Sequence, residues 1–497
     1  MDLSELRLDL KNYNAQREVF RLEKYLNQNH TKTEAEIEER AADLFSVSTI
    51  KTLEKLLESP ERQSEVEQKA RRDLLNVSRL GFLRDETKEV CQELEICQKS
   101  VRVKFQAEVL TSDEALEKIA SEEFAEKRSE IFAKLIDAQS SCANLLDEKF
   151  SGLQKSSRKL GFRNLQNLYE EITQINFEGF AGKAKNFLDK TEESYFQMLG
   201  NVGAEINLET KNLNSADIYF LREKLERRPI FSNQTLPRLY DRILENFGFN
   251  SRKITNIEII KTNEEQTETF CPNPPEQVNF CIANRNGASN LIEFLRCFGR
   301  ANQAAWTSKE LAQRFPEFVF APDNCLPAAF GILFQTLLTN RQFLGQSLGI
   351  QDEKLAAKII EENKFRLLYE VRDELLKFHL EVQIFGAGAA KIDEVAQNSA
   401  INFTNNLGFN FSREQMLFEI SENFNSQTRV RGFLFAYGLR EYLTQKYDFQ
   451  WWTSRRAFEE LIDFWNTSNH YQAEEMTRMI GFEMNFDLLA ETLLINN

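Results

Sequence analysis

Helix-breaking residues are scarce in this chain. It contains 19 glycines and 9 prolines in 497 residues, roughly half of their usual share. Long stretches such as Glu114–Leu146 instead place charged and apolar residues at a spacing of three to four, the period of a helix with one buried face. Few breakers together with this period predict a mainly α-helical protein.

Clustered positive charge and long apolar runs are also missing. The formal charge is −15, whereas nucleic acids and anionic membranes bind proteins through grouped lysine and arginine. Apolar stretches such as Leu326–Phe334 are far shorter than the roughly 20 residues of a membrane-spanning helix. The first residues contain no apolar core of a signal peptide. We therefore expect a soluble, cytoplasmic protein with no nucleic-acid or membrane partner.

Residues that bind transition metals are few. The three histidines, His30, His379 and His470, are isolated in the sequence, and the seven cysteines include no Cys-x-x-Cys pair. Zinc ribbons and dithiol redox sites use such pairs. We therefore expect reduced, mostly buried thiols, and no cofactor follows from these residues.

Local signals divide the chain into a helical N-terminal lobe, 1–211, and a second lobe, 212–497, that contains a small sheet over about 253–283. Three short segments of the second lobe resemble strands in composition: Lys253–Lys261, Thr267–Cys271 and Gln277–Ala283. We predict that they form a small antiparallel sheet of about three strands.

Two pairs of residues have the spacing of a capping box, in which a polar residue and a glutamate three positions later close the start of a helix. Thr33 and Glu36 form one pair, and Asn290 and Glu293 form the other. The second pair predicts a helix over about 290–306. A further helix is predicted over about 326–340, followed by helices to the end of the chain.

The predicted helix at 290–306 contains Arg296-Cys297-Phe298-Gly299-Arg300. Zinc hydrolases place His-Glu-x-x-His on such a helix, because imidazoles at i and i+4 face one ion and the glutamate acts as general base. Here Arg296 and Arg300 stand at the imidazole positions and Cys297 at the base position. Strand, turn, motif helix and second helix follow one another as in gluzincin metallopeptidases, and the chain resembles their thimet and oligoendopeptidase-like branch.

The second helix continues this resemblance. Family members carry a segment like D-N-A-x-x-E-G-x-A-x-L-F, whose glutamate is the third zinc ligand. Here the segment is Asp323–Phe334, and Ala328 stands at the glutamate position. The resemblance implies a two-lobed helical peptidase architecture from which the third ligand is also lost.

The C-terminal part resembles the same family. Its members carry a segment like F-Y-S-x-x-Y-L-R-A-W, with tyrosines near the substrate. The corresponding segment here is Phe424–Phe433, in which Asn425 and Arg429 replace the two tyrosines and Arg431 is kept. The resemblance therefore implies a site whose ligands, base and tyrosines have all been replaced.

Arginine does not substitute for histidine at a zinc site. Its guanidinium stays protonated and offers only donors, and two cations repel a divalent ion. We therefore expect no catalytic residues and no bound zinc. An active peptide hydrolase with a non-standard site remains an alternative, and Cys297 is its candidate nucleophile because the flanking arginines would lower its pKa.

The replaced site also offers candidate ligand-binding residues. Arg296 and Arg300 lie one turn apart and suit a carboxylate or phosphate, unless a carboxylate of the protein, such as Glu293, neutralises them. Arg431 is a third candidate.

The strand Gln277–Ala283 supplies two apolar candidates, Phe280 and Ile282. We expect this strand to line a cleft between the lobes and to pair as an edge strand with an extended peptide. The predicted function is an inactive metallopeptidase-fold protein that binds a peptide or protein partner in a retained cleft, or that forms a complex with an active relative.

Overall fold

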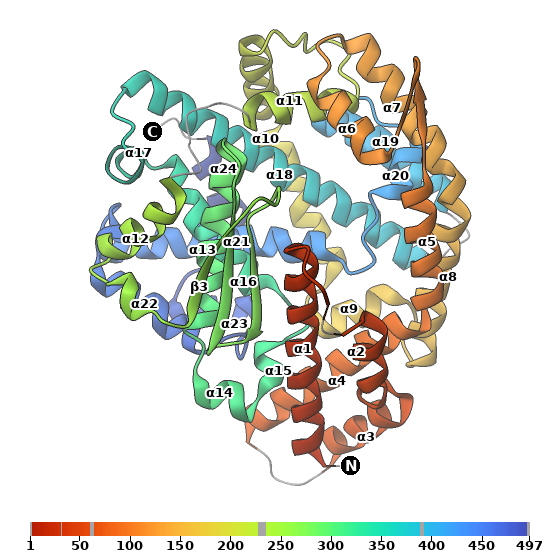
Figure 1. Ribbon diagram of the computed structural model, residues 1–497, viewed down its shortest axis with the longest axis vertical. Helices are drawn as coiled ribbons and strands as arrows, with labels where there is room; N and C mark the ends of the chain where they lie inside the picture. Colours follow the sequence, from red (N-terminus) through yellow and green to blue (C-terminus); the bar gives the residue numbers. More distant parts are fainter. Residues whose placement is uncertain (1, 31, 60–63, 227–234, 388–391, 495–497) are drawn as a thin grey trace. The chain divides into compact units, whose positions relative to one another are not determined.

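The structure is a computed structural model that describes residues 2–30, 32–59, 64–226, 235–387 and 392–494 (Figure 1). These residues are mainly helical, which confirms the predicted fold class. None of the helices among them is long and apolar enough to cross a membrane.

The chain forms two compact units, each assembled from several segments. Unit 1 comprises Met1–Phe82, Arg228–Ile360 and Arg431–Leu489. Unit 2 comprises Leu83–Arg227, Glu361–Val430 and Ala490–Asn497. Each unit takes residues from both sides of position 211, so the predicted lobes 1–211 and 212–497 do not coincide with the units. Long helices carry the chain across the unit boundaries: α4 (Glu65–Glu86), α18 (Glu353–Ala387) and α21 (Asn425–Tyr447).

Most elements of unit 1 are short helices. Its described α-helices besides the three long ones are α1 (Leu3–Tyr25), α2 (Glu34–Arg40), α3 (Val47–Glu58), α12 (Leu236–Asn246), α13 (Ala288–Ala305), α14 (Lys309–Arg314), α15 (Pro316–Val319), α16 (Cys325–Gln335), α17 (Arg341–Leu348), α22 (Arg455–Asn466), α23 (Ala473–Ile480) and the first part of α24 (Phe486–Leu494). Short 3-10 helices are η1 (Ala42–Phe45), η4 (Ser251–Lys253), η5 (Thr336–Thr339) and η7 (Trp451–Thr453).

Unit 2 contains a hairpin that the sequence did not predict, formed by β1 (Val103–Phe105) and β2 (Glu108–Leu110). Its described helices besides the long ones are α5 (Lys88–Ser100), α6 (Ser112–Ser121), α7 (Ala125–Gln139), η2 (Ser140–Cys142), α8 (Ala143–Lys159), α9 (Leu165–Thr173), α10 (Phe177–Glu205), α11 (Ala216–Glu226), α19 (Ile392–Leu407) and α20 (Arg413–Phe418).

The three predicted strands form one sheet in unit 1: β3 (Ile257–Thr262), β4 (Glu268–Asn273) and β5 (Gln277–Ala283). The strand order is β3-β5-β4. β4 pairs antiparallel with β5, as predicted, but β3 pairs parallel with β5, so the sheet is mixed. β5 has a partner on each side and is the central strand, which corrects the prediction that it is an edge strand.

The two capping boxes predicted from the sequence have different outcomes. Thr33 and Glu36 form the expected reciprocal bonds at the start of α2. Asn290 does not cap α13, because that helix begins two residues earlier and Gly287, with a φ of 118°, stands at its N-cap. The extra turn places Asn290 inside the helix, where its side chain is completely buried.

One pair of cysteines departs from the expectation of reduced thiols. Cys97 and Cys142 form a disulfide in unit 2, with their Cα atoms 6.0 Å apart. The sequence does not show this pairing because the two residues are 45 positions apart and are brought together by the packing of α5 against η2 and α8. The other cysteines are free thiols: Cys91, Cys271, Cys281, Cys297 and Cys325.

Candidate functional site

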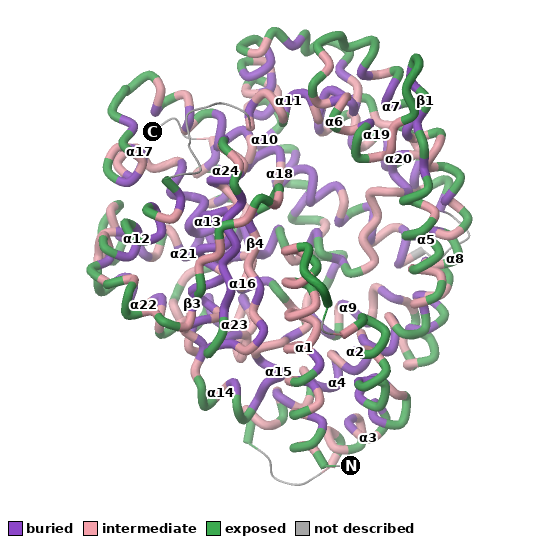
Figure 2. The backbone as a smooth tube through the Cα atoms, viewed as in Figure 1, coloured by how far each residue is buried: buried purple, intermediate pink, exposed green. Residues whose placement is uncertain are grey.

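The two predicted motif helices, α13 and α16, cross with their backbones in contact. A methyl group added at Gly299 of α13 would lie 2.2 Å from the carbonyl oxygen of Phe330 in α16. One added at Gly331 would lie 2.8 Å from the carbonyl oxygen of Arg296. Glycine lets two helices approach this closely because it has no Cβ. Figure 2 shows this part of unit 1, around α13 and α16, as a mostly buried region.

The two arginines of the motif have different partners. Arg296 Nε donates a hydrogen bond of 2.5 Å to Gln335 Oε1 at the end of α16. Arg300 Nη2 lies 3.4 Å from the Glu268 carboxylate of β4 and donates to Cys297 Sγ at 3.1 Å. The Arg300 side chain keeps 38% of its surface exposed. The carboxylate beside Arg300 is therefore that of Glu268, whereas the sequence pattern suggested Glu293.

The thiol of Cys297 is buried and held by hydrogen bonds. Its Sγ donates to the carbonyl oxygen of Thr267 at 3.4 Å while it accepts from Arg300. Burial raises the pKa of Cys297, although Arg300 acts in the opposite direction. The expectation that the flanking arginines lower this pKa is therefore wrong, because the cost of burying a thiolate is the larger effect.

A network of polar groups fixes the start of β4 against α13. Thr267 Oγ1 donates to Asn290 Oδ1 at 2.6 Å, and Asn290 Nδ2 donates to the Ala283 carbonyl at 3.0 Å. The Glu293 carboxylate accepts the backbone N–H of Thr267 at 3.0 Å and lies 3.6 Å from Arg285. Asn290 and Glu293 thus join the helix to the sheet instead of forming a capping box.

The third motif position, Ala328, faces α21. A methyl group added at Gly432 of α21 would lie 3.4 Å from Ala328 Cβ. The small residue at position 328 therefore leaves room for α21. Close contacts accordingly connect the motif positions of α13, α16 and α21 within unit 1.

Arg431 is completely buried and is paired with two carboxylates. Its Nη1 donates to Asp323 at 2.9 Å, and its Nε and Nη2 donate to the two oxygens of Glu474 at 2.7 and 2.6 Å. Asp323 also accepts the backbone N–H of Cys325 at the start of α16. Arg431 thus ties α21 to α16 and α23, and its guanidinium is not exposed to a ligand.

The two positions at which the resemblance implied tyrosines, Asn425 and Arg429, belong to unit 2. Asn425 is exposed at the start of α21. Arg429 is exposed and donates to Glu374 at 2.6 Å. Burial raises the pKa of Glu374, which Arg429 partly offsets. Both replacements are thus polar residues, neither of which offers a phenol.

The strand candidates Phe280 and Ile282 are core residues. Both are buried, with 0% and 3% of their surface exposed, and they lie on the central strand β5. Phe280 packs against Phe294 of α13 with ring centroids 5.2 Å apart. Their position supports a structural role, since both faces and both edges of this strand are covered.

β4 is the edge strand on the antiparallel side of the sheet, and helix α1 lies along it. The Glu18 carboxylate of α1 accepts the backbone N–H of Cys271 at 3.0 Å. The hydroxyl of Tyr25 donates to the carbonyl oxygen of Gln266, and the Tyr25 ring lies 5.1 Å from that of Phe270. Part of this edge is therefore already bonded within unit 1.

Similarity to known proteins is found at the level of structure. No family model matches the sequence, and no curated protein resembles it in sequence. An M32 carboxypeptidase from Deinococcus radiodurans R1 superposes with a TM-score of 0.59 at 10% identity, covering 99% of this chain and 97% of that chain. A Pyrococcus furiosus carboxypeptidase gives 0.61 at 13% identity, covering 99% and 98%. An oligoendopeptidase F-like protein from Bacillus anthracis gives 0.65 at 11% identity, covering 93% and 85%.

The chain has the fold of the helical metallopeptidases. The similarity to both carboxypeptidases extends over nearly the whole of each chain. Carboxypeptidases and oligoendopeptidase-like proteins share the fold, so the structural similarity does not favour the oligoendopeptidase-like branch that the sequence motifs resemble.

The residues that the sequence resemblance aligns with zinc ligands do not have the chemistry of zinc ligands. Arg296 and Arg300 are donors, Ala328 has no ligand atom, and the Cys297 thiol donates a hydrogen bond and has a raised pKa. Zinc binds thiolate, imidazole or carboxylate. In the described part of the chain, no three His, Cys, Asp or Glu side chains gather so as to hold a metal ion.

Sequence reasoning missed the partners of the motif residues. Gln335, Glu268 and Thr267 contact Arg296, Arg300 and Cys297 respectively. These three residues belong to no recognisable motif, because polar residues are common at the ends of strands and helices. The sequence does contain a signal for the crossing of α13 and α16. Gly299 and Gly331 are small residues on two consecutive helices, which is typical of a close crossing.

Proposed function

We propose that this chain is a metallopeptidase-fold protein without peptidase activity that binds a peptide or protein partner. The observation that carries the proposal is the contact of Arg300 with Cys297 and Glu268 at the place of the second ligand and the base. A cation paired with a carboxylate and a protonated thiol neither binds zinc nor activates water. The close crossing at Gly299 supports a folded frame around these replacements.

The binding part of the proposal rests on the exposed part of Arg300. The Arg300 side chain keeps 38% of its surface exposed and lies one turn from Arg296, and two arginines at this spacing suit a carboxylate, such as the C-terminus of a peptide. The strand β5 is central, so addition of a peptide strand to β5 does not support the proposal. Binding through a terminal carboxylate is the mode that the described side chains support.

Catalysis is tested by measuring metal content and turnover together. We expect purified protein to contain no stoichiometric zinc by mass spectrometry and to leave a quenched-fluorescence peptide library uncut. The triple variant Arg296→His, Arg300→His, Ala328→Glu is the matched comparison, and it should take up zinc if the three positions converge. Stoichiometric zinc in the natural protein, with cleavage that a chelator stops, would overturn the proposal.

Binding is tested by calorimetry with peptides that differ only at the C-terminus. A peptide with a free carboxylate should bind more tightly than its amide, by about tenfold for one lost charge-assisted contact. Arg300→Ala should remove this difference. Arg314→Ala, an exposed arginine of α14 paired with Glu310, should not. Equal affinity of both peptides for the natural protein would contradict carboxylate recognition.

The cysteine hydrolase alternative is tested by alkylation. Burial raises the pKa of Cys297, so iodoacetamide should modify it more slowly than the half-buried Cys91, because the thiolate is the reactive form. Peptide mapping by mass spectrometry gives both rates in one sample. Preferential modification of Cys297 in the folded protein would support a nucleophilic cysteine instead.

A further inference from the structure

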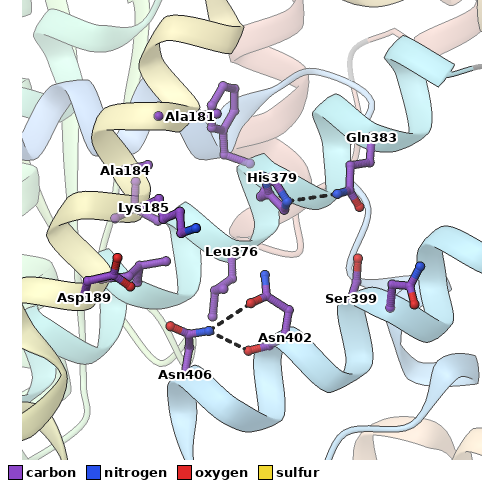
Figure 3. A pocket seen from close by; sticks show the side chains of 15 residues that line it. Ala181, Ala184, Lys185, Asp189, Leu376, His379, Gln383, Ser399, Asn402 and Asn406 are labelled. Carbon is purple, nitrogen blue, oxygen red and sulfur yellow. Dashed lines mark hydrogen bonds between the residues drawn. The ribbon is translucent and has the colours of Figure 1, made fainter.

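Unit 2 contains a groove of about 500 Å³ between helices α10, α18 and α19. This volume lies within the range of small-molecule sites, roughly 300–1,000 Å³. Figure 3 shows labelled polar side chains from all three helices, including Lys185, His379 and Asn402, around a common space. The groove involves none of the motif residues of α13 and α16.

Helix α19 contributes a row of amides to the groove. Asn398, Asn402 and Asn406 follow at intervals of four residues and share one face of the helix. Asn406 Nδ2 donates to the Asn402 side chain and carbonyl oxygens, both at 2.9 Å. This orientation leaves the side-chain N–H groups of Asn402 and the side-chain oxygen of Asn406 for another partner.

Ser399 adds a hydroxyl to the same wall. The residue is buried, with 4% of its surface exposed, and its hydroxyl makes no hydrogen bond within the described part of the chain. Because Ser399 lines the groove, its hydroxyl is available to a polar group of an occupant.

Helix α18 supplies a neutral imidazole. The Gln383 amide lies 2.9 Å from His379 Nε2. Burial lowers the pKa of His379, and the nearby positive charge of Lys185 lowers it further. The imidazole is thus uncharged near pH 7, and the charged groups of the lining come from α10.

Helix α10 places one cation and one anion at the groove. Lys185 and Asp189 are four residues apart on the same face, a rise of about 6 Å. Neither makes a hydrogen bond or an ion pair with another described residue. Lysine precedes the acid here, which is the less favourable order for an ion pair along a helix. Asp189 lies near enough to Arg372 to raise the pKa of that arginine, but neither charge is bonded to another described residue, so both can contact an external partner.

Arg372 of α18 connects the three helices that line the groove. Its guanidinium donates to the carbonyl oxygens of Leu188 and Asn406, both at 2.8 Å, and to Thr191 Oγ1 at 2.7 Å. These bonds tie α10 and α19 to α18, so the polar wall needs little ordering when a ligand binds.

We infer that this groove binds a small zwitterionic peptide, a dipeptide with free termini. Lys185 would bind its carboxylate and Asp189 its ammonium group, because the groove offers one cation and one anion from the same face of α10. The peptide bond carries one donor and one acceptor, which match the amide of Asn402 and the hydroxyl of Ser399. A neutral sugar would use the amides but would leave both charges unpaired.

The experiment compares three forms of one dipeptide by isothermal titration calorimetry: Ala-Gln with free termini, N-acetyl-Ala-Gln and Ala-Gln amide. The free form should bind most tightly, and each blocked form should bind about tenfold more weakly because one charge-assisted contact is lost. Lys185→Met should abolish discrimination against the amide while discrimination against the N-acetyl form persists. Asp189→Asn should show the reverse pattern.

Two matched controls lie on the same helix outside the lining. Lys183→Met and Glu193→Gln alter exposed charges of α10 and should leave all three affinities unchanged. Thermal melting of each variant checks that the fold is intact. Equal affinity of the free and blocked dipeptides for the natural protein, or tighter binding of trehalose than of Ala-Gln, would overturn the inference. Repeating the three titrations in Arg300→Ala separates binding in the groove from the carboxylate binding of the proposed function, because that variant leaves the groove unchanged.

Discussion

Arg431 in unit 1 and Arg372 in unit 2 are both completely buried, but they differ in what compensates their charge. Arg431 meets the carboxylates of Asp323 and Glu474, which outweigh the effect of burial and raise its pKa. Arg372 donates to backbone carbonyls and a hydroxyl, and burial lowers its pKa to about 10. Unit 1 bonds its buried arginine to carboxylates, whereas unit 2 bonds Arg372 to neutral oxygen acceptors.

The glycines of the two regions show the same contrast. Gly299 of α13 is in backbone contact with α16, whereas no described atom lies within 4 Å of a methyl group added at Gly182 of α10. The helix crossing at Gly299 therefore has no room for a side chain, whereas the surface at Gly182 does. The comparison teaches that helices of the same fold pack closely in one region and leave a groove in another.

The largest expected effect is on the buried charges. Arg431→Met leaves Asp323 and Glu474 without their partner, and breaking a buried pair in this way costs about 3–5 kcal/mol of unfolding free energy. Arg372→Met should cost less, roughly 1–3 kcal/mol, because its partners are neutral acceptors. Urea titrations of both variants give the two values. A larger loss for Arg372→Met would reverse the contrast between the units.

The next largest expected effect is the difference in stability between alanine substitutions at Gly299 and at Gly182. Gly299→Ala should destabilise the protein by about 1–3 kcal/mol, because the added methyl group meets a backbone carbonyl that cannot move aside. Gly182→Ala is the matched control and should stabilise it by about 0.5–1 kcal/mol, the ordinary gain of alanine in a helix. The same titrations measure both. A neutral Gly299→Ala would show that α13 and α16 are not in backbone contact.

A smaller effect depends on pH. Glu317 of α15 is wholly buried and accepts from Arg7 Nε at 2.8 Å, and burial raises its pKa from 4.5 to about 7. The folded state then holds a proton that the unfolded chain has released, so stability falls as pH rises from about 4.5 through about 7. Glu317→Gln should reduce this fall by roughly 1–2 kcal/mol, measured by unfolding at pH 5 and pH 8.

The control for the pH effect is Glu310→Gln, an exposed residue of the neighbouring α14. It should leave the pH dependence unchanged. The part of the fall that persists in Glu317→Gln is expected from Asp73, whose pKa burial also raises to about 7. Identical pH profiles of the natural protein and Glu317→Gln would contradict the raised pKa of Glu317.

Local signals predicted local structure well in this chain. The Thr33 box formed because both of its partners lie within one turn and nothing else competes for them. The pair Asn290 and Glu293 has the same spacing, yet Thr267 and Ala283 of the sheet take the bonds of these side chains. A capping signal therefore fails where a tertiary partner is available to the same groups.

The order of the strands in the sheet could not be predicted from the sequence. The composition of Gln277–Ala283 predicted a strand, and its nearly continuous apolar run is typical of a strand covered on both faces. The presence of β3 on its second edge, which makes β5 central, is a contact between residues about 20 positions apart. The prediction that β5 is an edge strand that pairs with a peptide was wrong for this reason.

The sequence by itself determined the helical class, the positions of most elements and the residue types in the segment Arg296–Arg300, because these depend on residue identity and on neighbours within a few positions. Tertiary structure alone decided that Glu268 meets Arg300, that burial governs the pKa of Cys297, that Arg431 is paired inside the core and that a polar groove opens between α10, α18 and α19. Desolvation and pairing depend on atoms brought together from distant positions, and the sequence pattern does not specify those distances.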